Sequence, residues 1–254
     1  MQTIDLNSDL GEGFGPWTMG DDAAMLSVVS SANLACGGHA GDTETMYNAC
    51  RSAARHGVVV GAHPSYVDRE GFGRRIIPMR PDEIGRMVVA QVGALAAIAR
   101  MAGSQVRYIK PHGALGNVAA ADVAVATGII DAVVAAFPEM AILAISGTQL
   151  EVAARAAGVE VYFEIFADRA YQPNGLLVPR NQPGAVIHDA DRAAQRLLAF
   201  VESGRMEVVS GEPIALAADS VCVHGDTPGA VEMAHHIRAR LTDAGLEPRP
   251  FLPT

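Results

Sequence analysis

Hydrophobic residues along the chain fall into short runs, separated by longer segments in which they recur at helical spacing. The runs are rich in β-branched residues or alanine and end at polar residues or glycine, a pattern typical of buried strands. The seven predicted strands are residues 2–7, 30–37, 57–63, 106–112, 141–146, 159–168 and 220–225. The seven predicted helices are residues 21–29, 42–56, 81–102, 120–137, 148–157, 189–202 and 228–244.

Residues that favour helix ends mark several of these boundaries. Asp42 and Thr227 suit N-cap positions, because their side-chain oxygens can accept hydrogen bonds from the first turn. Pro81 and Pro228 suit the first helical turn, where no backbone N–H is needed. The boundary residues therefore support the alternation of strands and helices.

Strict alternation of strand and helix predicts parallel strands joined by right-handed crossovers. We expect a TIM-like (β/α)7–8 barrel rather than an open doubly wound sheet, because polar residues follow nearly every strand and no GxGxxG opens a helix. A single barrel domain over residues 1–254 is predicted. The segment at about 170–187 has three prolines and two glycines and is predicted to form a lid-like loop.

Composition and charge exclude several classes of partner. The net charge is −9 and the arginines are scattered, so no basic stripe is available for a nucleic acid. The three cysteines show no CxxC spacing, which favours a reducing compartment over a disulfide framework. We expect no membrane span, and the acidic start with Asp5 and Asp9 is unlike a signal peptide. A cytoplasmic location is expected.

Four of the eight histidines follow an apolar run and adjoin glycine or proline: His39, His63, His112 and His224. Because the carboxyl ends of barrel strands meet at one rim, we expect all four there, although 185 residues separate the first from the last. One such histidine usually only caps a turn. Four in one layer, with carboxylates nearby, indicate a functional site.

Acidic residues are predicted to join the same layer. In the first strand, Asp5, Asn7 and Asp9 share one face at β period, and the barrel would turn this face inward. Two buried carboxylates on one strand need cations, hydrogen-bond donors or a metal. Further candidates in the sixth strand or after the strands are Glu12, Glu164, Asp168, Arg169 and Asp226. Asp168 and Arg169 could instead form a structural ion pair.

The sequence leaves open whether a metal is bound. It contains no HExxH, and a His/Asp set from separate strands is compatible with a metal ion without identifying one. The glycine-rich pieces GEGFG, CGGHAG and GFGRR do not match GxxxxGK[ST], so the chain has no Walker A loop. Any nucleotide would be held in another way or by another chain.

Lys110 is the only lysine of the chain and lies in YIKPHGAL, at the end of the fourth predicted strand. Lysine is a compact charge that can lose its proton when desolvated, which arginine does not do. Lys110 could therefore contact a substrate. Alternatively, it could only neutralise the buried charges of Asp5 and Asp9.

Seven motifs in order resemble the LamB/YcsF family, whose members are A subunits of prokaryotic ATP-dependent 5-oxoprolinase. They are DLNSDLGEGFG, NLACGGHAGD, GAHPSYVDREGFGRR, IKPHGAL, EIFADRAY, GLLVPR and VCVHGDTP, and they span residues 5–228. The sequence departs from the family pattern at Gly38, where an aromatic residue is usual, at Ser8, where cysteine is frequent, and at Gly116, where tyrosine is common.

This resemblance implies a barrel of the glycoside hydrolase/deacetylase superfamily type. It also implies cleavage of 5-oxoproline to L-glutamate, with ATP as co-substrate yielding ADP and phosphate, and partners that are B and C subunits. The expected catalytic residues are Asp9, Glu12, His39, Lys110, His112 and Asp168. The expected substrate-binding residues are Asn7, His63, Glu164, Arg169, Arg180, His224 and Asp226.

Two other functions are compatible with the same residues. The rim of histidine and aspartate could belong to a metal-dependent amide or sugar hydrolase or deacetylase that acts alone. The chain could also be a scaffold without catalytic groups that binds substrate for partner subunits.

Overall fold

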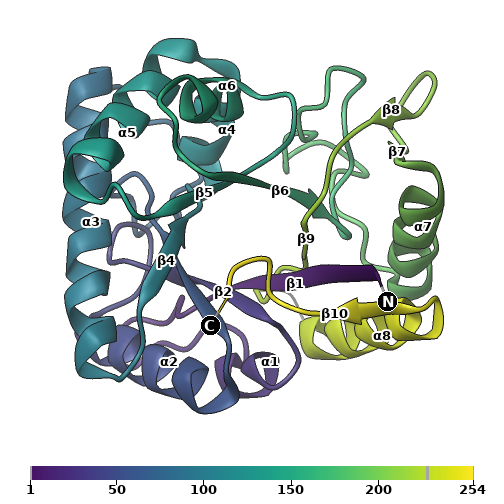
Figure 1. The fold of residues 1–254 in the computed structure, drawn as a ribbon, viewed down its shortest axis with the longest axis horizontal. Helices are drawn as coiled ribbons and strands as arrows, with labels where there is room; N and C mark the ends of the chain where they lie inside the picture. The colour runs from purple at the N-terminus through teal and green to yellow at the C-terminus, as the bar shows by residue number, and fades with distance from the viewer. Residues whose placement is uncertain (1, 227–228, 254) are drawn as a thin grey trace.

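Seven parallel strands form a closed ring with the helices outside it, as Figure 1 shows. The computed structural model of the protein describes residues 2–226 and 229–253. The ring consists of β1 (Gln2–Leu10), β2 (Ser31–Ala35), β3 (Val59–His63), β4 (Val106–Ile109), β5 (Ala141–Ala144), β6 (Val161–Phe166) and β9 (Ser220–Cys222). Each corresponds to one of the predicted strands.

Pairing between the first and last strands of the ring closes the barrel. Asp5 pairs with Ser220 in the β1–β9 register, and Asn7 pairs with Ser31 in the β1–β2 register. All pairings within the ring are parallel, as crossovers through helices require. The predicted TIM-like α/β barrel is therefore confirmed.

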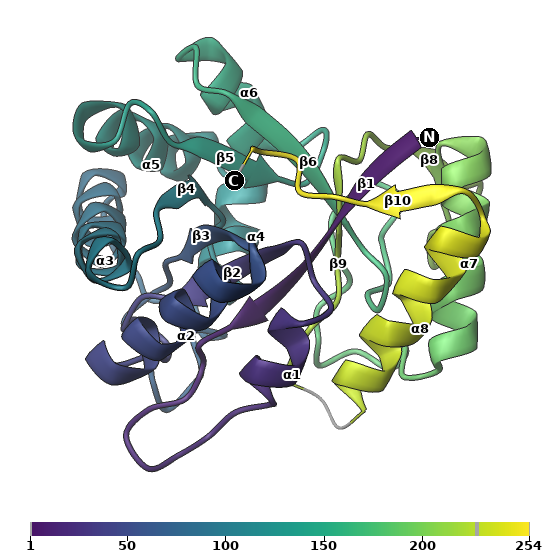
Figure 2. The same ribbon diagram turned by 60° about the horizontal axis from the view of Figure 1, so that its bottom comes forward.

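The helices surround the ring on its outer side, and α7 and α8 lie side by side in both ribbon views (Figures 1 and 2). They are α1 (Asp22–Leu26), α2 (Thr43–His56), α3 (Pro81–Met101), α4 (Gly113–Ala121), α5 (Val123–Ala136), α6 (Gln149–Ala156), α7 (Ala190–Ser203) and α8 (Ala230–Asp243). Asp42 caps α2 by accepting a hydrogen bond from Thr45 N at 2.8 Å, as predicted. Thr227 and Pro228 lie outside the described residues.

The structure differs from the predicted elements in three places. The helix predicted at 120–137 is α5, and an unpredicted helix, α4, precedes it. Asp122 separates the two, because α4 ends there and the Asp122 side chain caps α5 by accepting bonds from Ala124 N and Val125 N. A short antiparallel pair, β7 (Arg205–Met206) and β8 (Ile214–Ala215), precedes β9. An additional strand, β10 (Leu246–Pro248), pairs with the start of β1.

Helix α3 is long and apolar enough, by length and composition alone, to cross a membrane. The bent α4–α5 pair meets the same criterion when the two helices are counted together. In the structure, Ile84, Val88, Val92 and Leu95 of α3 are buried in the hydrophobic core. Core helices commonly share the composition of a span, so this is weak evidence for a membrane.

Alternation along the strands divides the interior into two regions. In β3, Val60 and Ala62 join the large apolar core between strands and helices, whereas Val59 joins a small cluster with Tyr108. Tyr108 extends so close to β3 that any side chain at Gly61 would collide with its ring. Phe251 packs on Tyr108, with ring centroids 4.9 Å apart, so residues from the C-terminus close the amino-terminal end of the barrel.

Asp5 lies inside the barrel and is satisfied by hydroxyl groups. Ser30 Oγ and Ser31 Oγ donate to its Oδ1 at 2.6 Å and 2.7 Å, and Ser220 Oγ also donates to its carboxylate. Burial nevertheless raises the pKa of Asp5 from 3.8 to about 6, and the serine hydrogen bonds only partly offset this. The hydrogen-bond donors to Asp5 are therefore neutral hydroxyl groups. Asp5 does not need Lys110 to neutralise a buried charge.

Asp5→Asn tests this burial through the pH dependence of stability. The folded state holds the Asp5 proton more tightly than the unfolded chain, so wild-type stability should fall as pH rises from about 4 to about 6. The contribution is on the order of 3 kcal/mol at about 1.4 kcal/mol per pKa unit. Urea unfolding across this range should show the fall in wild type and its loss in Asp5→Asn. The exposed Asp131→Asn serves as control, and parallel curves for all three proteins would contradict the assignment.

Candidate active site

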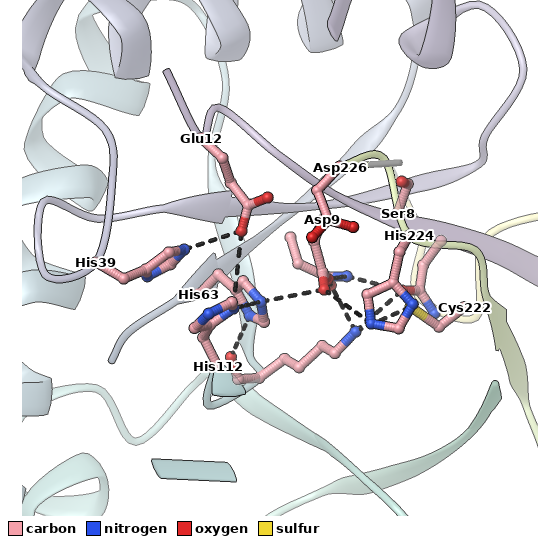
Figure 3. Close-up of polar contacts among 12 residues, drawn as sticks. Ser8, Asp9, Glu12, His39, His63, His112, Cys222, His224 and Asp226 are labelled. Atoms are coloured by element: carbon pink, nitrogen blue, oxygen red, sulfur yellow. Dashed lines mark hydrogen bonds and ion pairs between the residues drawn. The ribbon is translucent and has the colours of Figure 1, made fainter. Parts of the chain in front are cut away.

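The predicted rim residues converge at the carboxyl ends of the strands. His39, His63, His112 and His224 are all buried there, together with Asp9. Figure 3 shows Glu12, His39, His63 and His112 grouped on one side of Asp9, and His224 and Cys222 on the other. The expectation that four histidines distant in sequence share one rim is therefore confirmed.

The Lys110 ammonium group lies among four side chains inside the barrel. Its Nζ is 2.9 Å from Asp9 Oδ1 and 2.9 Å from Glu164 Oε2, which forms two ion pairs. It also lies 3.4 Å from Asn7 Oδ1 and 3.2 Å from Cys222 Sγ. Burial opposes the charge, but Asp9, Cys222 and Glu164 together raise the pKa of Lys110 well above its usual value. Lys110 is therefore held as a cation.

Asp9 is the residue on which most of these contacts meet. Burial opposes its ionisation, yet His63 and Lys110 hold the pKa of Asp9 well below the usual range. Beneath it, Asn33 Nδ2 donates to Asp9 Oδ1 at 2.8 Å and to Asn7 Oδ1 at 2.7 Å. Tyr108 OH donates to Asn33 Oδ1 at 2.6 Å, which fixes the amide orientation. Asp9 is thus an ionised, oriented carboxylate.

His63 and His112 face each other through one ring nitrogen each. If neither nitrogen carries a hydrogen, something positive must lie between them. His63 Nδ1 donates to the Lys110 carbonyl at 2.7 Å, and His112 Nε2 donates to the Phe72 carbonyl at 2.9 Å. If both rings are neutral, His63 Nε2 and His112 Nδ1 are unprotonated, and they lie 3.0 Å apart. Their lone pairs repel, so a proton or a cation is required between them.

Glu12 and His39 form a buried pair beside this cluster. His39 Nε2 lies 2.9 Å from Glu12 Oε1, and the His39 ring stacks on His112 with centroids 3.7 Å apart. Burial and the nearby charge of Asp9 raise the pKa of Glu12 to about 8, and burial lowers the pKa of His39 to about 3. One proton shared by the two groups keeps the pair neutral.

His224 forms a separate pair with Asp168. Its Nδ1 donates to both carboxylate oxygens of Asp168, at 2.9 Å and 2.7 Å. Burial raises the pKa of Asp168, but the interaction with His224 outweighs burial and the net shift is downward. The possible ion pair of Asp168 with Arg169 is not formed among the described residues, because the Arg169 guanidinium donates to the Val178 and Ala185 carbonyls.

Three sets of side chains bring potential metal ligands within 4.8 Å of one another: Asp9 with His63 and His112, Asp9 with Cys222 and His224, and Glu12 with His39 and His112. The first set fits a metal ion best. In neutral rings, the hydrogens of His63 and His112 are on the nitrogens that donate to carbonyls, so the two facing nitrogens are free to act as ligands. Asp9 Oδ2 lies 3.3 Å from His63 Nε2. Such spacing suits neighbouring ligands about 2.0–2.2 Å from a common ion.

A cavity of about 560 Å³ opens over these residues. Asp9, Lys110 and His224 line its floor, and Leu177, Pro179, Arg180 and Asn181 line it from the segment predicted as a lid. Arg180 is half-buried and forms no ion pair within the described part of the chain. Burial lowers the pKa of Arg169 to about 10, and its bonds to carbonyls hold this segment in place.

Some functional contacts were missed from the sequence. Asn33 was treated as part of an apolar strand, although a polar residue within SANLA could have indicated an inward-facing position. Arg74 lines the cavity and pairs with Asp226, and Phe166 lies beneath both Lys110 and His224. These contacts follow from the barrel register, for which no local sequence signal exists.

Two of the departures from the family pattern have visible structural consequences. Any side chain at Gly38 would collide with Gln91, whose amide bonds with the Ser65 backbone N–H and carbonyl at 3.0 Å and 2.6 Å. Gly116 lines the cavity, so its lack of a side chain affects the shape of that space.

A separate hollow of about 630 Å³ lies on the outer surface between α3 and α5 and contains none of the rim residues.

Comparison with known proteins supports the resemblance. The 5-oxoprolinase A subunit of Mycobacterium avium is 52% identical, covering 99% of this chain and 100% of that protein. A 5-oxoprolinase A subunit of Pseudomonas syringae pv. tomato is 49% identical, covering 99% and 98%. The crystal structure of the lactam utilization protein of Thermus thermophilus is 42% identical, has a TM-score of 0.91, and covers 98% and 99%. Residues 4–254 match the LamB/YcsF family, and the chain belongs to that family.

Proposed function

We propose that this protein is the A subunit of an ATP-dependent 5-oxoprolinase, which cleaves 5-oxoproline to L-glutamate while ATP is hydrolysed to ADP and phosphate. The observation that carries the proposal is the near-complete match to relatives named as A subunits of 5-oxoprolinase. The cavity supports it, because a chamber of about 560 Å³ with buried acid–base groups suits a small polar substrate.

The chemistry of a lactam explains why such groups are needed. A five-membered lactam is a weak electrophile, and phosphorylation of its oxygen by ATP would make its carbonyl carbon easier for water to attack. Arg180, which lines the cavity, is placed to bind the carboxylate of 5-oxoproline. The rim carboxylates and histidines supply candidate proton acceptors.

Partner chains are part of the same proposal. The relatives carry the name of one lettered subunit, which implies that they work in assemblies of several chains. Because this sequence has no Walker A loop, we infer that partners of the B and C types contribute to the use of ATP. A cytoplasmic location is the natural one for an enzyme that depends on ATP.

Lys110 has a supporting role in this proposal. Its ammonium already contacts Asp9 and Glu164, so it has little capacity to bind a substrate carboxylate directly. We infer that Lys110 keeps Asp9 ionised and in position at the cavity floor. The interpretation of Lys110 as a neutralising partner thus gains support, with Glu164 rather than Asp5 as the second carboxylate.

A second candidate is a metal-dependent amide or sugar hydrolase or deacetylase that acts without partners. The facing nitrogens of His63 and His112 favour it, and Asp9 would complete the ligand set. A bound ion would polarise a carbonyl group or lower the pKa of a bound water. Lys110 would then limit the charge that Asp9 brings to the ion.

Three tests follow from the proposed function and its site, and the first concerns the reaction. Purified protein mixed with its B and C type partners should release glutamate from 5-oxoproline only when ATP is present, and the chain alone should release none. Glutamate and phosphate measured together would show the coupling. Release of glutamate by this chain alone, without ATP and with one tightly held metal ion per chain, would instead establish the second candidate.

The second prediction concerns the space between His63 and His112. A divalent ion such as Zn²⁺ should raise the melting temperature of the wild-type protein, because an ion that binds only the folded state stabilises it. His63→Ala should abolish this rise, whereas His235→Ala, on the exposed face of α8, should retain it. Equal shifts in all three proteins would place the ion elsewhere, and no shift in any would indicate that a proton fills the space.

The third prediction concerns the buried cation. Lys110→Met should lower the free energy of unfolding by about 3–5 kcal/mol, because Asp9 and Glu164 lose their shared partner in a buried site. Urea unfolding at neutral pH measures the loss. Arg55→Met at the exposed end of α2 is the control, with an expected change within about 0.5 kcal/mol. A similar small change for Lys110→Met would contradict the charge-balance role.

A further inference from the structure

The four rim histidines differ in how their ring nitrogens are used. His63 and His112 each bond one nitrogen to a carbonyl and turn the other toward its neighbour. His39 bonds Glu12 through Nε2, its buried Nδ1 has no hydrogen-bond partner in the part of the chain that the structure describes, and His39 does not line the cavity. Among the four, only His224 both lines the cavity and has a ring nitrogen, Nε2, without a hydrogen bond within the described residues.

The protonation of the His224 ring is set by Asp168. A carboxylate with both oxygens within 2.9 Å of Nδ1 accepts its hydrogen, so in the neutral ring Nε2 is left as a proton acceptor. The ring is also held by stacking on Phe166, with centroids 5.5 Å apart and planes at 20°. Phe166 pairs with Cys222, two residues before His224, in the β6–β9 register. Backbone pairing therefore holds Phe166 close to the segment that carries His224.

The other candidate bases are already engaged. Asp9 carries the contacts of Lys110, Asn33 and His63, which hold it as the ionised partner of cations. Glu12 shares its proton with His39 and does not line the cavity. His224 Nε2 lies 3.9 Å from Asp9 Oδ2, so the acceptor nitrogen is beside the charged floor of the cavity without being bonded to it.

We propose that His224 is the proton-transferring catalytic residue of the lactam cleavage and that Asp168 is its positioning residue. His224 Nε2 accepts a proton from water as the water oxygen forms a bond to the lactam carbonyl carbon. The imidazolium then returns this proton to the ring nitrogen as the carbon–nitrogen bond breaks. Because the lactam oxygen is phosphorylated, the adduct also passes its hydroxyl proton to nitrogen, and cleavage leaves an acyl phosphate and a free amine. A second water hydrolyses the acyl phosphate to the open-chain carboxyl group and phosphate, and the imidazole is regenerated. This inference depends on the proposed lactam substrate.

The geometry explains why one imidazole can perform both transfers. Asp168 stabilises the imidazolium that exists between them, since its carboxylate stays bonded to Nδ1. The sequence-based expectation had placed Asp168 among the catalytic groups and His224 among the substrate-binding groups. The structure favours the reverse assignment. His224 lines the cavity, whereas Asp168 does not line it and binds His224 instead.

Kinetics of the reconstituted complex with ATP test the proposal. His224→Ala should lower kcat for glutamate release by about 100-fold or more, the loss typical of a positioned acid–base group, with KM for 5-oxoproline nearly unchanged. Added imidazole should restore part of the rate, because it can occupy the vacated space and transfer the proton. His224→Gln keeps a polar side chain but cannot accept and return a proton. It should fold as the wild type does and be as slow as His224→Ala.

Asp168 is tested by Asp168→Asn and Asp168→Glu. The amide cannot enforce the same tautomer, so kcat should fall while KM is retained, and the glutamate variant should recover part of the rate. His235→Ala, an exposed imidazole on α8, should behave as wild type.

Three results would overturn the assignment: an undiminished kcat in His224→Gln, a loss confined to KM, or a His224→Ala rate that does not respond to imidazole. A wild-type complex that releases no glutamate would instead contradict the proposed function itself.

Discussion

A single buried ammonium group, that of Lys110, determines how the interior of this barrel is organised. Asp9 on β1 and Glu164 on β6, the two strands that flank β9 in the ring, both approach it to 2.9 Å. Without this cation, two carboxylates would face each other away from water, at a cost of several kcal/mol. The position of Asp9 then fixes where His63 and His224 meet the cavity, because both lie against its second oxygen.

The site built on this interaction has two parts. On one side of Asp9, the stacked rings of His39 and His112 and the facing nitrogens of His63 and His112 form a compact cluster that requires a shared proton or cation. On the other side, His224 presents one nitrogen to the cavity. Asp9 therefore lies between the facing nitrogens of His63 and His112, which require a shared proton or cation, and His224, which lines the cavity.

The structure also shows how a barrel can tolerate so polar an interior. Asp5 is satisfied by three serine hydroxyls, and Tyr108 reaches across the interior to orient Asn33 because Gly61 leaves room for its ring. Each of these buried polar groups has partners from neighbouring strands, so the register of the ring decides whether the interior is stable. Apolar contacts from Phe251 close the other end.

The sequence by itself determined the seven strands of the ring, most helices and the shared rim, because the two-residue and 3.6-residue periods and the residues after each strand are local signals. It also indicated that Asp5, Asn7 and Asp9 share a face. It did not determine that Lys110 pairs with Glu164, that Asp168 binds His224 or that Asn33 supports Asp9. These partners lie on different strands, and the stagger of a closed ring brings them into contact, so only the tertiary structure decided which charges would meet.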